Sequence, residues 1–271
     1  MKKIIALLML AAAAALPATA VAAEAEVYAD VLSAYVYRGQ VGNDEAVFQP
    51  GLDVSGPLGL GASLWANMDL TDNADSWYPN TAGEWGELNL GLNWTCPCEG
   101  PVSLTLGGLY FVYPQDPSEA EVLEDGSVAV SEAPADGSYE LFVAVAAEDL
   151  LLAPSATFYH DLDNTDDWAA QLSIGHGFDL VDQLTLDLGA TVGFAGDYYI
   201  ADNYGSDAGS AFTHVQLDAG LNYALTEQAS VGLKASFSSI LDGDVRDDIE
   251  ADEVYPEVDI FYGGVTASYS F

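Results

Sequence analysis

Carboxylates are the most abundant reactive groups in this chain, which has 43 aspartates and glutamates against five lysines and arginines. Two runs place aspartates at alternate positions, as calcium-binding loops do: residues 161–167 (DLDNTDD) and 242–253 (DGDVRDDIEADE). Neither has the full calcium-loop pattern, because the glycine at the sixth place is missing from both and Arg246 occupies the fifth place of the second. We interpret both runs as solvated charge, with weak binding of divalent cations by acidic loops as the alternative.

The histidines and cysteines offer little for catalysis or metal binding. The three histidines are His160, His176 and His214. No G-x-S-x-G nucleophile elbow accompanies them. Cys96 and Cys98 stand two residues apart without a further cysteine nearby, which disfavours a zinc site, and their pairing in a local disulfide is left open. We therefore expect no enzyme, no cofactor, no metal ligands and no catalytic residues.

The first 23 residues have the layout of a cleaved secretory signal. Lys2 and Lys3 precede an uncharged apolar stretch from Ile4 to Leu16, and small residues follow as far as Ala23. The apolar stretch is shorter than the roughly 18 residues that a membrane-spanning helix requires. We expect residues 1–23 to be removed and residues 24–271 to form a single exported domain.

The expected mature chain keeps three basic residues, Arg38, Lys234 and Arg246, against all of its carboxylates. Nucleic acid is disfavoured as a partner, because phosphate binding depends on lysine and arginine. Half of the residues are nevertheless hydrophobic, and 15 are tyrosines. A disordered acidic chain lacks such residues. The chain must therefore fold, with its carboxylates placed where they stay solvated and repel one another little.

Apolar and polar residues alternate along most of the chain, as they do in half-buried strands. In residues 184–196, for example, leucines at every second position alternate with residues such as Thr185 and Asp187. Twelve segments of this kind are predicted. They cover residues 27–38, 46–55, 58–69, 84–95, 102–113, 139–148, 153–161, 167–178, 184–196, 212–224, 228–240 and 260–271.

The connections between these segments are sorted by length and by charge. Short turns follow the even-numbered segments, and four of the odd-numbered ones end in the long loops 70–83, 114–138, 197–211 and 241–259. Acidic residues gather in the long loops, and lipid cannot solvate a charge. This pattern is typical of an all-β, antiparallel, up-and-down transmembrane β-barrel. We predict about 12 strands in the outer membrane, with short periplasmic turns and long acidic extracellular loops.

Two short stretches resemble known features of outer-membrane proteins. The ending GGVTASYSF, with Tyr269 and Phe271 in an alternating pattern, resembles the carboxy-terminal signal read by the barrel assembly machinery. The stretch DVLSAYVYRGQ, residues 30–40, resembles the opening strand of a little-characterised bacterial outer-membrane family, in which Tyr35 to Gly39 fit and Ala34 replaces the usual aspartate. The resemblance implies a porin-like barrel of about this size.

The polar face of the segments predicts what lines the lumen. Its residues are mostly Gly, Ser, Thr and Asn, which leave room for water. The charged candidates for the pore lining are Arg38, Glu87, Asp187, Asp218 and Lys234. We expect Arg38 to pair with a neighbouring lumen carboxylate. Because carboxylate rings attract cations, the sequence predicts a passive diffusion pore for small solutes that favours cations.

Three alternatives remain open. A non-conducting structural or adhesive barrel shares all of the strand evidence. An outer-membrane phospholipase would need a histidine on the lipid-facing surface, and His214 falls on the polar face. A secreted acidic β-sandwich is the alternative outside membranes. The expected partners are outer-membrane lipid, lipopolysaccharide, the assembly machinery and small solutes, and no stretch indicates an oligomeric state.

Overall fold

The computed structural model describes residues 23–115, 120–122, 128–130 and 137–271. The expected signal sequence, except for Ala23, and most of the loop 114–138 lie outside these residues. Among the described residues, no helix is long and apolar enough to cross a membrane.

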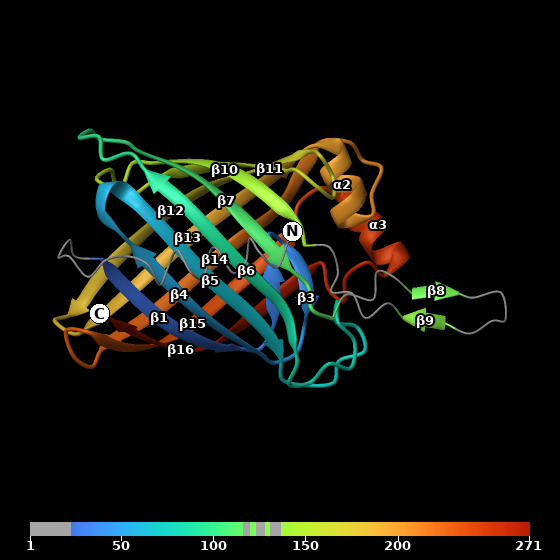
Figure 1. Ribbon diagram of the computed structural model, residues 1–271, viewed down its shortest axis with the longest axis horizontal. Helices are drawn as coiled ribbons and strands as arrows, with labels where there is room; N and C mark the ends of the chain where they lie inside the picture. Colours follow the sequence, from blue (N-terminus) through green and yellow to red (C-terminus); the bar gives the residue numbers. More distant parts are fainter. Residues whose placement is uncertain (1–22, 116–119, 123–127, 131–136) are drawn as a thin grey trace.

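Twelve antiparallel strands close into a barrel, and each pairs with its neighbours along the chain (Figure 1). The last strand closes against the first, with Asp30 opposite Thr266. The strands are β1 (Glu24–Leu32), β4 (Val47–Ser55), β5 (Leu60–Asp69), β6 (Trp85–Thr95), β7 (Ser103–Val112), β10 (Tyr139–Ala146), β11 (Ser155–Asp161), β12 (Trp168–Val181), β13 (Leu184–Ala195), β14 (Ala211–Ala224), β15 (Ala229–Ile240) and β16 (Asp259–Ser270). The predicted fold and strand number are confirmed.

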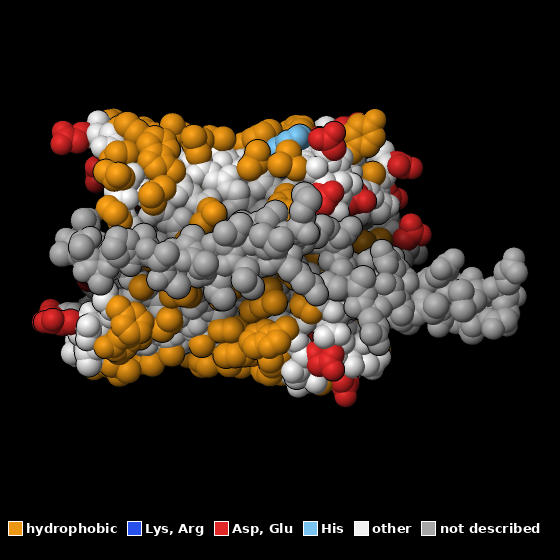
Figure 2. Space-filling view, viewed as in Figure 1, with side chains coloured by type: hydrophobic (Ala, Val, Ile, Leu, Met, Phe, Trp, Pro, Cys, Tyr) orange, Lys and Arg blue, Asp and Glu red, His pale blue; other side chains and the backbone are white. Residues whose placement is uncertain are grey.

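Side-chain alternation separates an apolar outer surface from a polar interior. Leu233 of β15, which is 56% exposed, and its partner Val265 of β16 both lie on the outer surface. Their chain neighbours Lys234 and Gly264 pair on the opposite face, toward the lumen. Figure 2 shows hydrophobic side chains over the middle of the barrel, with aspartates and glutamates toward its two ends. This is the arrangement that a lipid bilayer requires of a β-barrel.

A charge placed on the outer surface is expected to be costly. Leu233→Arg should lower the free energy of unfolding by about 2–4 kcal/mol, because the guanidinium would face hydrocarbon. The measurement is urea unfolding in lipid vesicles, with Leu233→Ala as the control for lost apolar contact. If the arginine variant is no less stable than the alanine variant, this face does not contact lipid.

The first predicted segment, residues 27–38, is wrong at its carboxyl end. The barrel strand β1 stops at Leu32, and the chain turns inward to form a hairpin of β2 (Tyr35–Tyr37) and β3 (Gln40–Asn43). Arg38 and Gly39 form its two-residue turn, with φ values of 51° and 87°. Positive φ at both central residues suits the right-handed twist of a tight hairpin, so the chain reverses here instead of continuing as a strand.

The other long connections also fold at the end of the barrel where the hairpin lies. Two of them form short helices, α2 (Asp197–Tyr204) and α3 (Gly243–Asp252), and β8 (Ala120–Val122) pairs with β9 (Val128–Val130). Most of the acidic run 242–253 is therefore helical, and Asp242 caps α3 by accepting from the amides of Asp244 and Val245.

The opposite end of the barrel carries the short turns, including the 3-10 turn η1 (Pro57–Gly59). The pairing of Cys96 and Cys98, which the sequence leaves open, is a disulfide in the turn between β6 and β7. At this end the amide of Phe271 donates to the carbonyl of Ala25 at 2.8 Å, and its ring packs edge-on against Tyr269 at 4.9 Å.

Candidate functional site

The β2–β3 hairpin lies across the lumen and contacts walls on both sides of it. On one side Tyr35 packs against Trp65 of β5 and donates to Glu87 of β6. On the other side Arg38 pairs with Glu140 of β10, and Gly39 packs against His214 of β14. In the circular strand order β6 and β14 stand on opposite sides of the barrel, whereas β10 lies two strands from β6. The hairpin therefore bridges the barrel near its long-loop end.

The hairpin and the two helices share an apolar core inside the mouth of the barrel. Val41 of β3 packs in one buried cluster with Ile200 and Tyr204 of α2 and with Val245 and Ile249 of α3. The hydroxyl of Tyr204 also donates to the carbonyl of Arg38 at 2.7 Å. Burial of these side chains holds the hairpin and helices together as one unit.

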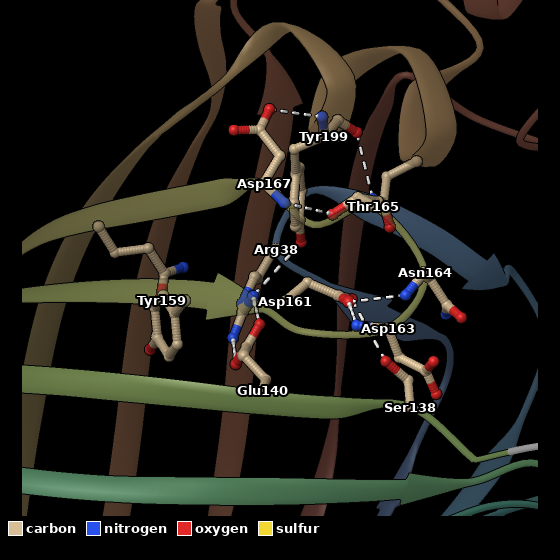
Figure 3. Close-up of polar contacts among 12 residues, drawn as sticks. Arg38, Ser138, Glu140, Tyr159, Asp161, Asp163, Asn164, Thr165, Asp167 and Tyr199 are labelled. Carbon is tan, nitrogen blue, oxygen red and sulfur yellow. Dashed lines mark hydrogen bonds and ion pairs between the residues drawn. The ribbon is translucent and has the colours of Figure 1, made fainter.

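Arg38 connects the hairpin tip to the wall and to α2 (Figure 3). Its two terminal nitrogens each donate to one oxygen of Glu140 at 2.7 Å, and the guanidinium lies 3.7 Å from the ring centroid of Tyr159. It also donates to the hydroxyl of Tyr199 at 3.3 Å. The two charged side chains are only 7% and 4% exposed. A bidentate pair of this kind fixes the position of the hairpin tip.

Two aspartates order the segments around this ion pair. Asp167, just before β12, accepts from the amide of Tyr199 at 2.9 Å and so ties α2 to the wall. Asp161 accepts from the amides of Asp163 and Asn164, both at 2.8 Å, and closes the turn between β11 and β12. The acidic run 161–167 is therefore a hydrogen-bonded turn (Figure 3).

Gly39 allows the hairpin to approach the wall closely. A Cβ at this position would lie 2.5 Å from the Cβ of His214, and the positive φ already favours glycine. His214 is buried, with its Nδ1 2.9 Å from the Thr213 hydroxyl and its Nε2 3.4 Å from the Gln171 amide nitrogen. The expectation that His214 points to the lumen is confirmed by these contacts.

Two cavities lie on either side of the hairpin. The outer cavity, of about 390 Å³, is bounded by the hairpin and the long loops, and the inner cavity, of about 300 Å³, lies against Arg38, Gln171, His214 and Gln216. Tyr37 lines both cavities. Its buried hydroxyl has no hydrogen-bond partner among the described residues. Tyr37 is the one residue that the linings of these two cavities share.

The predicted lumen residues fall into separate groups. Lys234 donates to Asp30 at 2.5 Å, so these two charges neutralise each other. Asp187 and Asp218 lie on adjacent strands, opposite Gly220 and Gly189 respectively. The carboxylate of Asp187 accepts from Asn222, and that of Asp218 accepts from Gln216 and Ser236. Glu87 lies apart from these groups, at the outer cavity.

Sequence reasoning missed Asp30 and Glu140, the partners of the two lumen cations. Both carboxylates are buried. Each is on the inner face of its strand, since the neighbouring Val31 and Leu141 are exposed on the outer surface. Strict application of the alternation to residues 139–146 would have indicated Glu140, although not its pairing with a residue 102 positions away.

Below the hairpin, the inner face carries small hydroxyl side chains that bond across the strands. The pairs, with their oxygen–oxygen distances, are Thr95 with Thr105 at 2.9 Å, Ser173 with Thr191 at 2.8 Å, and Ser230 with Ser268 at 2.9 Å. Such short side chains leave the middle of a 12-stranded barrel free for water.

Other candidates for chemistry stand apart from one another. No cluster of three or more His, Cys, Asp or Glu side chains within the described ranges is arranged to hold a metal ion. His160 lies 3.5 Å from Asp166 near the long loops, and His176 packs against Phe178 in the part of β12 that leads to the short turns. At the outer cavity, burial and the nearby Asp161 raise the pKa of Asp202 in α2.

Comparisons with known proteins find barrels of a similar kind. No protein-family model matches the chain, and no curated protein resembles it in sequence. The NanC porin is 11% identical with a TM-score of 0.49, covering 90% of this chain and 98% of its own. The KdgM porin is 8% identical with a TM-score of 0.49, covering 92% and 99%. The COG4313 outer membrane channel from Pseudomonas putida F1 is 12% identical with a TM-score of 0.47, covering 94% and 97%. Because these scores lie below 0.5, we base the fold on this chain's own strand pairing.

Proposed function

We propose that this chain is an outer-membrane channel through which small solutes diffuse, with cations favoured over anions. The observation that carries the proposal is the polar inner face beneath the hairpin. Asp187 and Asp218 stand there among small hydroxyl side chains, and neither is in an ion pair of the described residues. Unneutralised carboxylates on a water-filled wall attract cations and repel anions.

The location follows from the outer surface together with the expected signal sequence. An exported chain that forms a closed barrel with an apolar exterior can be held by the outer membrane without a spanning helix. We propose that lipid and lipopolysaccharide surround it there. Tyr269 and Phe271, at the short-turn end, are proposed as the signal that the assembly machinery reads.

A non-conducting barrel is the second candidate, and one observation favours it. The hairpin, α2 and α3 share a packed core in the mouth of the barrel, and the hairpin residue Tyr37 lines both cavities. If this unit never moves, the barrel would have a structural or adhesive role. Conductance distinguishes the two candidates directly.

The experiment is electrical recording of the purified protein in a planar bilayer under a KCl gradient. We expect discrete conductance steps and a reversal potential of the sign that K⁺ preference produces. Detergent carried through the same purification without the protein is the control. Absence of steps would favour the structural barrel, and a reversal potential of the opposite sign would contradict the proposed selectivity.

A further inference from the structure

The outer cavity has a wall of aromatic rings. Six aromatic residues line it, from the hairpin, the long loops and the ends of strands: Tyr35, Tyr37, Trp77, Tyr78, Tyr113 and Tyr255. Trp77 joins two of the others, because its ring centroid lies 5.5 Å from that of Tyr35 and 6.0 Å from that of Tyr255. The amide of Trp77 donates to the carbonyl of Gly42 at 2.8 Å, which fixes this ring against the hairpin. The rings are therefore held in place, and their faces carry negative potential.

Glu87 adds a buried negative charge to this cavity. It is 2% exposed and lines the outer cavity. One of its oxygens accepts from the hydroxyl of Tyr35 at 2.7 Å and the other from the amide nitrogen of Asn89 at 2.9 Å. None of the ion pairs found among the described residues includes Glu87. A buried carboxylate without a cationic partner is energetically costly, so a bound cation would relieve the cost.

Gln40 supplies a hydrogen-bond donor in the same cavity. Its side-chain oxygen accepts from the hydroxyl of Tyr255 at 3.0 Å, which orients the amide. Its Nε2 is buried and has no hydrogen-bond partner among the described residues, and the residue is 3% exposed. An unpaired buried donor favours a ligand that brings an oxygen atom.

We propose that the outer cavity binds a small organic cation, of the quaternary ammonium class, that also carries a hydroxyl or other oxygen. The aromatic faces and Glu87 take the ammonium group, and Gln40 donates to the oxygen. Rings attract such a cation because it is weakly hydrated, whereas a metal ion requires several oxygen ligands. A neutral sugar would stack on the rings but leave Glu87 without a cation. A role of this site in selecting solutes for transport rests on the proposed function. The binding itself can be measured without any measurement of conductance.

The first experiment compares two probes of the same shape by calorimetric titration of the full chain in detergent. Choline carries the charge, and 3,3-dimethylbutan-1-ol is its neutral equivalent. We expect choline to bind at least about tenfold more tightly than the alcohol, because the charge supplies most of the attraction. Equal affinities, or no binding of choline, would overturn the proposal. Binding of glucose without binding of choline would show a sugar site instead and would overturn it as well.

Variants then test whether the binding occurs in the outer cavity. Glu87→Gln keeps an oxygen for Tyr35 but removes the charge, and we expect roughly tenfold weaker choline binding. Trp77→Leu should weaken it by a similar factor through loss of the ring face. Asp163→Asn is the matched control, because Asp163 is exposed at the same end of the barrel and does not line the cavity. We expect Asp163→Asn to bind choline as tightly as the wild type does.

The outcomes separate this proposal from the channel function. If Glu87→Gln folds, as judged by its heat-modified mobility on gels, and binds choline like the wild type, the site is not the outer cavity. Asp202→Asn provides a second test on a helix residue that also lines the cavity, and a modest loss of affinity is expected. A barrel that conducts but does not bind choline refutes only the cation site. A barrel that binds choline but does not conduct refutes only the channel.

Discussion

Arg38→Ala is expected to destabilise the protein by about 3–5 kcal/mol and to increase its single-channel conductance several-fold. The variant leaves the carboxylate of Glu140 buried without its cation, and a lone buried charge costs more than the pair contributes. It also removes the contact of the hairpin tip with Tyr159 and Tyr199. The hairpin should then leave the lumen for part of the time, which widens the path for ions.

The two effects are measured by urea unfolding in lipid vesicles and by recording in planar bilayers. The double variant Arg38→Met with Glu140→Leu is the informative control. It removes both buried charges, so we expect it to recover much of the lost stability. Arg38→Lys keeps the charge but not the bidentate geometry, and an intermediate result is expected. Unchanged conductance and stability in Arg38→Ala would show that the ion pair does not hold the hairpin.

Reversing the charge of two lumen carboxylates is expected to invert the ion selectivity. In the variant Asp187→Lys with Asp218→Lys, the wall beneath the hairpin changes from two negative charges to two positive ones. The local potential should change by several kT, which corresponds to a roughly tenfold change in the ratio of cation to anion permeability. The measurement is the reversal potential under a KCl gradient.

The matched control for this variant is Asp187→Asn with Asp218→Asn. It keeps the side-chain shape and removes the charge, so we expect a selectivity between that of the wild type and that of the lysine variant. Both effects should weaken at high salt, because ions in the lumen screen the wall charges. If the lysine variant keeps the wild-type reversal potential, these carboxylates do not determine selectivity.

The barrel itself could be predicted from the sequence because its two signals, the alternation within strands and the lengths of the loops, can be read from short stretches of the chain. Alternation with period two follows from each strand separating lipid from water, as in residues 184–195 of β13. The loop lengths follow from the antiparallel topology. Segment 46–55 is a barrel strand even though it contains Pro50, which the strand accommodates opposite Ala29 of β1.

The inward hairpin could not be predicted because long-range contacts determine where it lies. Residues 35–37 (YVY) favour a strand, as the residues before them do, and nothing in them reveals that the chain reverses at Arg38 and Gly39. The contacts that hold the hairpin inside come from distant parts of the chain, such as Glu140 and Ile200. The resemblance of residues 30–40 to an opening strand therefore holds for their sequence, but only residues 30–32 lie in the barrel strand β1.

The sequence indicates the two helices at the mouth of the barrel only weakly. In α3, Asp242 precedes Val245 and Ile249, an N-cap followed by apolar residues four apart. That pattern favours a helix over a calcium loop. In α2, the residues Asp197–Tyr204 show little amphipathic periodicity, and the helix is supported by the buried cluster and by Asp167, both of which come from distant parts of the chain. The outer cavity is lined by α2 and by Val254 and Tyr255 after α3, so it could not be derived from local sequence.

The most direct test of the account asks whether ions pass through the lumen beside the hairpin. Gln216 lines the inner cavity, and its neighbour Leu217 is exposed on the outer surface. The test treats both cysteine variants in planar bilayers with a bulky, positively charged, water-soluble thiol reagent. The single-channel conductance of Gln216→Cys should fall by about half or more, because the attached group fills part of the lumen. The conductance of Leu217→Cys should not change. A barrel that carries no current, or a Gln216→Cys channel whose conductance does not respond although the cysteine is shown to be modified, would contradict the account.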